Sequence, residues 1–218
     1  MRLIRLPGVH RPISDAWILA DAMRAELSGG RRRVLDVCTG TGVLAIAAAR
    51  EGAEATAIDL SRRALACVRM NAALNRVRVE ALRGDLFEPV RGRRFDVIVT
   101  NPPYVPGPSD RLPERGIERA WYAGLDGRVL VDRICDAAAD HLLPGGVVLM
   151  VHSSINDEQE SVRRLAEKGL EASVPVRRRG PLGPLFGDQA EELERRGLLT
   201  AGQREEEVVV VRGERPRE

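Results

Sequence analysis

The sequence predicts an α/β protein with a right-handed, doubly wound sheet. Short apolar runs recur along the chain and alternate with helical segments at the spacing of β-α-β units. Glycine-rich or aspartate-containing turns follow several of these runs, as expected where buried parallel strands end. With 218 residues, of which 44% are hydrophobic, the chain is long enough for one well-buried core, so we expect a single domain over residues 1–212.

The first half of the chain gives the clearest pattern of elements. A run of five residues lies between Gly-Gly and Thr-Gly-Thr-Gly, and an alanine-rich helix that ends near Gly52 follows it. Ser61 is a helix-capping residue, and Leu65, Val68 and Leu74 lie along one face of the helix after it. The predicted strands here are residues 33–37, 54–58, 77–82 and 95–100, with helices over residues 43–50 and after residue 61.

The second half is less regular. Residues 101–124 contain five prolines, and long irregular connections of this kind are commonly functional. A helix over residues 128–142 turns through Pro144-Gly145-Gly146 into the next strand. The remaining predictions are strands over residues 147–151, 171–176 and 206–211, helices over residues 157–168 and 188–196, an insertion rich in Arg, Gly and Pro within residues 177–203, and a frayed tail over residues 213–218.

Composition limits the possible partners. The 34 basic residues nearly cancel the 32 acidic ones, so a net charge of +2 gives little attraction to a phosphate backbone. Aromatic residues make up only 3%, which leaves few platforms on which bases could stack. Cys38, Cys67 and Cys135 form no disulfide framework and no C-x-x-C metal pair. We therefore expect a cytoplasmic protein without a structural metal, a membrane span or a dedicated nucleic-acid surface.

The turn after the first strand predicts a nucleotide-containing ligand. Asp36-Val37-Cys38-Thr39-Gly40-Thr41-Gly42 lies where a strand passes into a helix, so backbone N–H groups can approach a ligand there. Asp59 ends the next strand and can accept from both hydroxyls of a ribose. Asp85 ends the third strand and could accept from an adenine amino group. Because the relaxed dinucleotide pattern G-x-G-x-x-A also fits, the ligand at this point is any adenosine-containing cofactor.

Asn101-Pro102-Pro103-Tyr104 follows the fourth strand and predicts the chemistry. The two prolines fix the backbone and remove two donors, which leaves the Pro102 carbonyl and the Asn101 side-chain oxygen as rigid acceptors. Two acceptors in a plane suit a planar NH₂ group, either a carboxamide or the exocyclic amine of a base. Holding both N–H bonds orients this weak nucleophile, while Tyr104 packs on its flat face.

We call the Asn101–Tyr104 segment the acceptor clamp, because it would hold the planar nitrogen. The electrophile that fits this arrangement is the methyl group of a sulfonium. The nitrogen becomes acidic only as the new bond forms, so no basic side chain is needed before attack. His10, His141 and His152 all lie outside the motif, in agreement with this chemistry, and we interpret them as structural or exposed.

These motifs, in this order, resemble the class I S-adenosylmethionine-dependent methyltransferases, and in particular the HemK-like N5-glutamine methyltransferases. The most similar branch is the short one that modifies translation release factors of the eukaryotic and archaeal type. The opening segment, residues 9–19, resembles the opening segment of the family, and Pro12, Asp15 and Leu19 occupy matching positions in it. The branch assignment depends on Gly116-Ile117-Glu118-Arg119-Ala120-Trp121, Gly124-Leu125-Asp126-Gly127-Arg128 and Asp132-Arg133.

The resemblance implies a Rossmann-like sheet of seven strands, one of them antiparallel, with helices on both faces. It implies S-adenosylmethionine as cofactor and S-adenosylhomocysteine as product. The cofactor-binding residues that it implies are Asp15, Asp36, Cys38, Thr39, Gly40, Gly42, Asp59, Leu60, Asp85, Leu86 and Asn101. The implied acceptor site consists of Asn101, Pro102, Pro103 and Tyr104, which would hold the glutamine of the Gly-Gly-Gln loop of a release factor.

The chain departs from the family pattern at three places. Cys38 stands where many members have glycine, His10-Arg11 replaces acidic or aromatic residues, and residues 177–203 are longer than in the short branch. The insertion could form a lid or a partner surface, but we favour a solvated loop. Relatives work with a small zinc-bearing activator subunit, for which strand 77–82 offers an edge, although the alternation of Arg78 and Glu80 also suits an edge protected by charge.

The sequence is compatible with several functions. The first is methyl transfer to a glutamine amide of a release factor. Its rivals are an adenine-N6 methyltransferase acting on DNA or RNA, an N-methyltransferase of a small metabolite, a nicotinamide-binding protein and a partner-binding module without catalysis.

Overall fold

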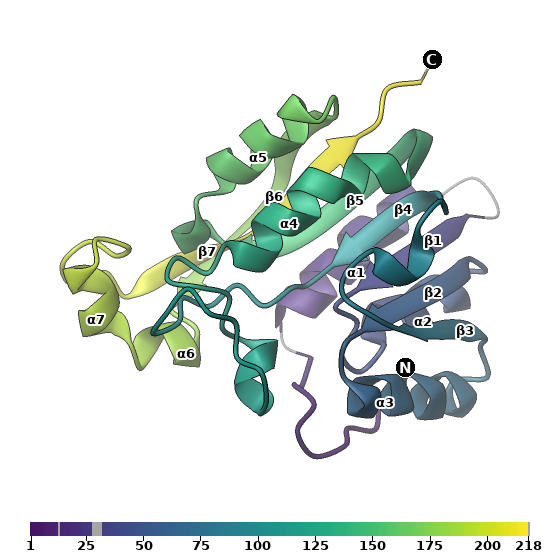
Figure 1. Cartoon of the computed structure of the whole chain (residues 1–218), viewed down its shortest axis with the longest axis horizontal. Helices are drawn as coiled ribbons and strands as arrows, with labels where there is room; N and C mark the ends of the chain where they lie inside the picture. Colours follow the sequence, from purple (N-terminus) through teal and green to yellow (C-terminus); the bar gives the residue numbers. More distant parts are fainter. Residues whose placement is uncertain (13, 28–31, 218) are drawn as a thin grey trace.

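The computed structural model describes residues 1–12, 14–27 and 32–217, which form one sheet with helices on both faces (Figure 1). The seven strands of these residues have the order β3-β2-β1-β4-β5-β7-β6, and β7 runs antiparallel to the other six. The strands are β1 (Arg33–Val37), β2 (Glu54–Asp59), β3 (Val79–Arg83), β4 (Phe95–Thr100), β5 (Leu142–Ser153), β6 (Glu171–Pro181) and β7 (Glu205–Glu214). The fold class expected from the sequence is confirmed.

Helices pack on the two faces in separate groups. Helices α1, α2 and α3 cover one face, and α4 and α5 cover the other. The α-helices are α1 (Ser14–Glu26), α2 (Val43–Arg50), α3 (Arg62–Leu74), α4 (Val129–Ala138), α5 (Glu158–Glu167), α6 (Pro184–Gly187) and α7 (Ala190–Arg195). Short 3-10 helices are η1 (Glu88–Val90), η2 (Ile117–Ala120), η3 (Ala139–His141) and η4 (Ser154–Asn156).

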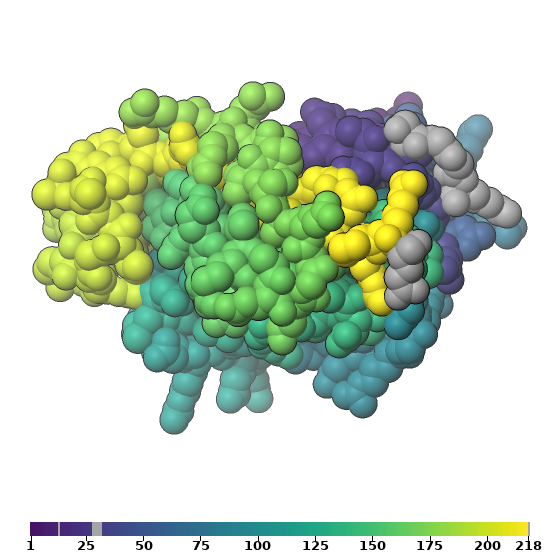
Figure 2. All heavy atoms as spheres, turned by 90° about the horizontal axis from the view of Figure 1, so that it is seen from above, coloured from purple at the N-terminus to yellow at the C-terminus, as the bar shows by residue number. Residues whose placement is uncertain are grey.

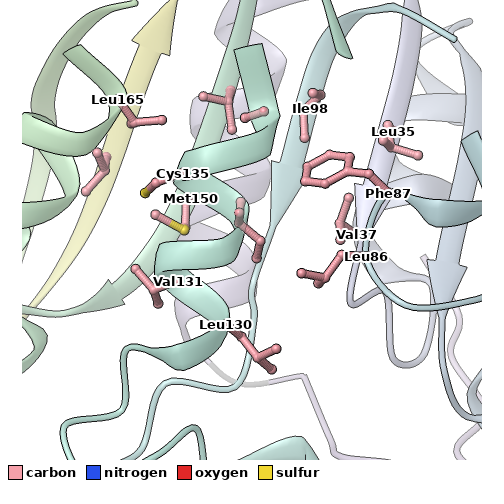
Figure 3. Close-up of a cluster of buried hydrophobic side chains, with 14 of the residues drawn as sticks. Leu35, Val37, Leu86, Phe87, Ile98, Leu130, Val131, Cys135, Met150 and Leu165 are labelled. Atoms are coloured by element: carbon pink, nitrogen blue, oxygen red, sulfur yellow. The ribbon is translucent and has the colours of Figure 1, made fainter. Parts of the chain in front are cut away.

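Each face of the sheet buries its own apolar layer, because side chains alternate along a strand. In β1, Val34 packs with α1 and α2, whereas Leu35 and Val37 belong to the layer beneath α4. Figure 3 shows the second layer, in which Met150 of β5 lies beside Val131 and Cys135 of α4. The two layers hold the sheet rigid, so the loops at its carboxyl edge start from strand ends whose positions are fixed.

The sheet reverses its direction of winding beside β1. Chain order takes β2 and β3 to one side of β1 and β4 to the other, so the loops after β1 and β4 diverge at this point. Ligands of open α/β sheets bind at such switch points. The architecture therefore directs attention to residues that follow β1, β2, β3 and β4.

Three sequence predictions near the C-terminus were wrong. Strand β5 begins at Leu142, before the Pro144-Gly145-Gly146 segment that we had interpreted as a turn. Strand β6 continues to Pro181, because the arginines of the expected insertion pair across the strands with the Glu205–Glu207 run, as in Arg177–Glu207 at 3.0 Å. Strand β7 extends through Glu214, and Arg215 exchanges backbone hydrogen bonds with residues 145–146, so the expected frayed tail is ordered at its start.

Helix α1 was not predicted. Its buried residues Ala16, Leu19, Ala20 and Met23 have the i, i+3, i+4, i+7 spacing of an amphipathic helix, so the signal was present. The helix matters for the site because it places Asp15 in its first turn.

Candidate cofactor and acceptor site

The predicted cofactor residues gather at the carboxyl edge of the sheet. Val37 pairs with Ile58 and Thr100, and Asp59 pairs with Arg83, so the four strand ends lie at one level. The turn after β1 contacts the end of β2 directly: Thr39 N donates to Ile58 O at 3.0 Å, and Gly40 N donates to Asp59 Oδ2 at 2.9 Å. The turn after β1 and the residues at the ends of β2, β3 and β4 therefore lie side by side although they are far apart in sequence. We call this edge of the site the rim.

Backbone conformation explains the composition of the first turn. Cys38, Gly40 and Gly42 have φ values of 59°, 55° and 84°, in the left-handed region that favours glycine. A Cβ at Gly42 would lie 3.1 Å from Cγ2 of Val68, so the helix α3 also restricts this position. Cys38 carries a side chain at a conformation that costs an L-residue about 1 to 2 kcal/mol, so a glycine would adopt this turn with less strain.

Asp36 is a fully buried carboxyl group within this turn. Its Oδ2 accepts from Thr39 Oγ1 at 2.6 Å and from Ala45 N at 3.0 Å, whereas Oδ1 is buried without a hydrogen-bond partner among the described residues. Burial raises the pKa of Asp36 to about 7, and the two hydrogen bonds only partly oppose this. An acceptor with an unused oxygen suits a donor or cationic group of a ligand.

Asp59 and Asp85 continue the rim. Asp59 accepts from Gly40 N and, at 2.8 Å, from Ser61 N, and burial raises its pKa. Leu60, the next residue, is 42% exposed beside these carboxylates, so its side chain is accessible to a ligand. Asp85 forms an ion pair with Arg133 of α4 at 2.6 Å, a contact that the sequence analysis did not anticipate.

Leu86 follows Asp85 and has a left-handed backbone, with φ of 47°. Its side chain is buried against the layer under α4, where Figure 3 shows it near Val37. Leu86 is therefore part of the core at the edge of the rim, as well as a neighbour of the predicted cofactor residues.

The Asn101–Tyr104 segment begins directly after β4 and reaches α1. Pro102 is buried, whereas Asn101 is partly exposed. The Tyr104 hydroxyl donates to Oδ2 of Asp15, and burial followed by the Asp15 charge raises the pKa of Tyr104 well above its usual value. The predicted Asp15 thus joins the site through Tyr104, although no periodic pattern links residues 15 and 104.

A second contact joins the N-terminal segment to the loop after β4. Nε1 of Trp121 donates to Nδ1 of His10 at 2.9 Å, and burial lowers the pKa of His10, which keeps Nδ1 available as an acceptor. Val105 N in turn donates to Trp121 O at 2.8 Å. His10, which the sequence analysis left outside the site, is structural, but its partner belongs to the loop of the site.

Residues 182–199, here called the arm, pack against the same loop. Phe186, Leu193 and Leu199 form a small apolar cluster with Val105, and the Phe186 ring lies 6.3 Å from the Tyr104 ring at an interplanar angle of 22°. Figure 2 shows the arm at one end of the molecule, next to the loop after β4, as in Figure 1. The expectation of a solvated loop was therefore wrong for this segment.

Polar contacts fix the arm at both ends. Gly183 N donates to Oε1 of Glu206 at 2.7 Å, and Nη1 of Arg196 donates to Gly107 O at 3.1 Å. Burial raises the pKa of Glu206, which lies close enough to Tyr104 for its charge to raise the pKa of the phenol as well. Among the residues that the structure describes, no cluster of His, Cys, Asp or Glu could hold a metal ion.

Comparisons with known proteins agree with this geometry. Residues 14–120 match the family model described as "Methyltransferase small domain". The chain superposes on an rRNA N2 G1207 methyltransferase of T. thermophilus in complex with AdoMet and guanosine, with a TM-score of 0.66, 25% identity and coverage of 97% of this chain and 46% of the other. The fold and the rim define an S-adenosylmethionine-dependent methyltransferase.

The family follows from more specific relatives. A protein of Methanocaldococcus jannaschii named as a protein N5-glutamine methyltransferase is 33% identical over 83% of this chain and 90% of its own length. Human methyltransferase HEMK2 is 32% identical over 78% of this chain and 83% of its own. The Mtq2-Trm112 complex of E. cuniculi, described as responsible for methylation of the termination factor eRF1, has a TM-score of 0.65, 26% identity and coverage of 95% and 99%. The chain belongs to the HemK-like protein N5-glutamine methyltransferase family.

Proposed function

We propose that this protein transfers the methyl group of S-adenosylmethionine to the side-chain amide nitrogen of a glutamine in a translation release factor. The observation that carries the proposal is the Asn101–Tyr104 segment, which lies at the switch point of the sheet beside the rim of carboxylates. Relatives with this activity in their names, such as the release factor glutamine methyltransferase of Deinococcus radiodurans, 40% identical over 65% of this chain and 52% of its own length, support the choice of acceptor.

The rim fits the cofactor in its donor and acceptor chemistry. The unused Oδ1 of Asp36 suits the cationic amino group, and Asp59 retains lone pairs for the ribose hydroxyls. We assign Leu60 to a face of the adenine and Asp85 to the adenine amino group, and Leu86 to the cofactor site through its backbone. Asp15 and Asn101 would lie near the methionine moiety. Cys38, Thr39, Gly40 and Gly42 would contribute backbone groups, which tolerate the cysteine.

The acceptor clamp supplies orientation rather than acid-base catalysis. The Oδ1 atom of Asn101 and the carbonyl of Pro102 would accept the two N–H bonds of the amide and aim its nitrogen at the methyl carbon. When bound, the cofactor supplies an electrophilic methyl group on a positively charged sulfur. As the N–C bond formed, the C–S electron pair would remain on sulfur, and the nitrogen would then release its proton to water. Tyr104, with its hydroxyl engaged by Asp15, stays uncharged during the step.

The test is methyl transfer from labelled cofactor to purified release factors. We expect label on the glutamine of the Gly-Gly-Gln loop and none after substitution of that glutamine in the substrate. The Asn101→Ala variant should lose about 100-fold or more of kcat, while its cofactor Kd stays within about threefold, because the clamp acts on the acceptor. Label on DNA, RNA or a small amine, with none on release factors, would contradict the proposal.

We also infer that the edge strand β3 can bind a small activator subunit. The sheet ends at β3, and the solved Mtq2 relative is a complex with Trm112. Part of this edge is guarded, because Nη2 of Arg69 donates to Ala81 O at 3.2 Å and Glu80 pairs with Arg93 at 2.8 Å. Coexpression with a Trm112-type protein should give a complex with higher activity than the chain alone. Full activity of the chain alone, with no complex on size-exclusion chromatography, would contradict this inference.

The described residues include no helix that is both long and apolar enough to cross a bilayer.

A further inference from the structure

The carbonyl of Tyr104 has an anchor that lies far away in sequence. The Nδ2 atom of Asn156, in η4 after β5, donates to Tyr104 O at 2.7 Å and to Asp126 O at 2.9 Å. Asn156 is only 1% exposed, so these bonds form away from competing water. One buried amide group therefore ties together the end of the clamp and the segment before α4.

The clamp needs such an anchor because of its composition. Pro102 and Pro103 have no N–H groups, so the segment cannot hold itself in place by donating from these positions. The first backbone donor with a partner after the clamp is Val105 N, which donates to Trp121 O at 2.8 Å. The Tyr104 carbonyl precedes that bond in the same peptide unit. Asn156 thus fixes the plane of the peptide that ends the rigid segment.

Asn156 is itself held in place by a buried cation. Nη1 of Arg128 donates to Asn156 O and, at 2.7 Å, to Asp157 O. Nη2 of Arg128 donates to Asp132 Oδ1 at 2.7 Å and to Ser161 Oγ at 3.2 Å, and the Arg128 residue is 6% exposed. These contacts connect α4, η4 and α5, so the amide of Asn156 has little freedom to turn away.

Gly127 shows how closely these groups approach one another. Its φ is +75°, and a Cβ there would lie 2.1 Å from Tyr104 O and 2.5 Å from Nδ2 of Asn156. The Gly127-Arg128 pair, which the sequence analysis used only as a branch signature, therefore has a physical role. The glycine lets the backbone reach the Tyr104 carbonyl, and the arginine holds the residue that binds it.

We propose that Asn156 is a positioning residue for the acceptor clamp. It sets the orientation of the acceptors of Asn101 and Pro102 by fixing the carbonyl at the end of their segment. The proposal rests on the proposed function in so far as the clamp holds the acceptor nitrogen, but it makes no claim about which molecule carries that nitrogen.

The test compares Asn156→Asp with a matched control. Aspartate has the same shape but would present an oxygen to two carbonyls, so the peptide should shift. Because misplacement by about 1 Å can cost 100-fold, we expect kcat to fall by about 10- to 100-fold, with the cofactor Kd within about twofold of wild type. The control is Asn75→Asp, since Nδ2 of Asn75 also donates to two carbonyls, Arg2 O at 2.6 Å and Asn71 O at 2.8 Å, but at the C-terminal end of α3. It should leave kcat within about twofold.

Two further variants guard against misfolding. In Asn156→Ser the side chain is neutral but too short to reach both carbonyls. In Gly127→Ala the added methyl group would clash with the same Tyr104 carbonyl. Both should lower kcat more than they raise KM for the acceptor. A folded Asn156→Asp or Asn156→Ser variant with unchanged kcat would overturn the proposal, and so would an equal loss of cofactor affinity, which a merely structural role produces.

The assay separates this proposal from the proposed function. If the wild-type protein does not methylate release factors but transfers methyl groups to another amide or amine, the function is wrong, and the same variants are compared on that acceptor. A selective loss of kcat there would still support the role of Asn156, whereas unchanged kcat would refute it.

Discussion

Asp59 takes part in the turn in which it lies and is also the candidate ligand of the ribose. Its two carboxylate oxygens accept from Gly40 N and Ser61 N, which joins the turn after β1 to the start of α3. A carboxylate has about four lone-pair sites, so these bonds leave room for two hydroxyl donors. The same residue therefore shapes the site and offers acceptors in it, and the two roles have to be separated by experiment.

Replacing Asp59 by alanine should weaken cofactor binding by about 1.5 to 3 kcal/mol, the value of hydrogen bonds to a charged group. Isothermal titration calorimetry with S-adenosylmethionine measures this change. The control is Ser61→Ala, which removes the cap that Ser61 Oγ forms with Ala64 N at 3.3 Å. It should cost about 1 kcal/mol of unfolding free energy without changing the cofactor Kd. An unchanged Kd in Asp59→Ala would show that Asp59 does not bind the ribose.

At the scale of elements, the prediction succeeded where local pattern and tertiary structure agree. Strands β1 and β4 and helix α2 have the predicted bounds, because apolar runs flanked by glycine or proline leave few alternatives. The arginine-rich start of the expected insertion belongs to β6, because its arginines pair with glutamates of β7. These glutamates lie about 30 residues further along the chain, so a local sequence pattern does not reveal the pairing. The carboxylate rim was likewise predictable from strand order, since every strand end carries its own signal.

The arm could not be placed from the sequence, and its position predicts a role in acceptor binding. Phe186→Ala removes the ring that lies beside Tyr104, so we expect a loss of about 3 kcal/mol in unfolding free energy and a fall of about tenfold in kcat/KM for the acceptor. The cofactor Kd should not change. Chemical denaturation measures the unfolding free energy, and steady-state kinetics well below the melting temperature measures kcat/KM.

The control for Phe186→Ala is Leu165→Ala, which opens a cavity in the layer under α4 and α5 and lies outside the arm. It should lose similar stability and keep kcat/KM for the acceptor. If both variants lost kcat/KM equally, the effect of Phe186 would be one of general stability and the arm would have no specific role.

At the scale of the whole molecule, the site depends on contacts between distant segments. The Tyr104–Asp15 bond joins the loop after β4 to α1, and the Trp121–His10 bond joins it to the N-terminal segment. Such pairs follow no periodicity and become visible only when the sheet has set the distances between its loops. This is why the sequence could indicate the residues of the clamp but not the groups that hold them.

His152 connects elements across the molecule in the same way. It is the last residue but one of β5. Its Nδ1 lies 2.9 Å from Ser153 O, and its Nε2 lies 3.1 Å from Oγ of Ser161 in α5, which also accepts from Arg128. The carbonyl requires the proton on Nδ1, so Nε2 accepts from the hydroxyl. Burial, with a contribution from the Arg128 charge, lowers the pKa of His152 to about 4. Protonation would remove the acceptor and place a second charge beside Arg128.

The free energy of unfolding should therefore depend on pH through His152. Between about pH 4 and pH 6.5 the unfolded chain binds a proton that the folded protein excludes, so this contribution to stability increases as the pH rises, by up to about 1.4 kcal/mol per pH unit. Asp36, with its raised pKa of about 7, acts in the opposite direction between about pH 4 and 7. A profile of the wild-type protein alone would show only the sum.

The comparison with His152→Gln isolates the histidine, because Asp36 is common to both proteins and glutamine can donate and accept without titrating. Chemical denaturation from pH 4 to 8.5 should show the stability of wild type relative to His152→Gln rising by about 3 kcal/mol up to pH 7 and then staying constant. A difference that does not vary with pH would mean that the buried imidazole titrates in the folded protein as it does in the unfolded chain. The contacts of His152 with α5 and Arg128 would then contribute nothing to the pH dependence of the unfolding free energy.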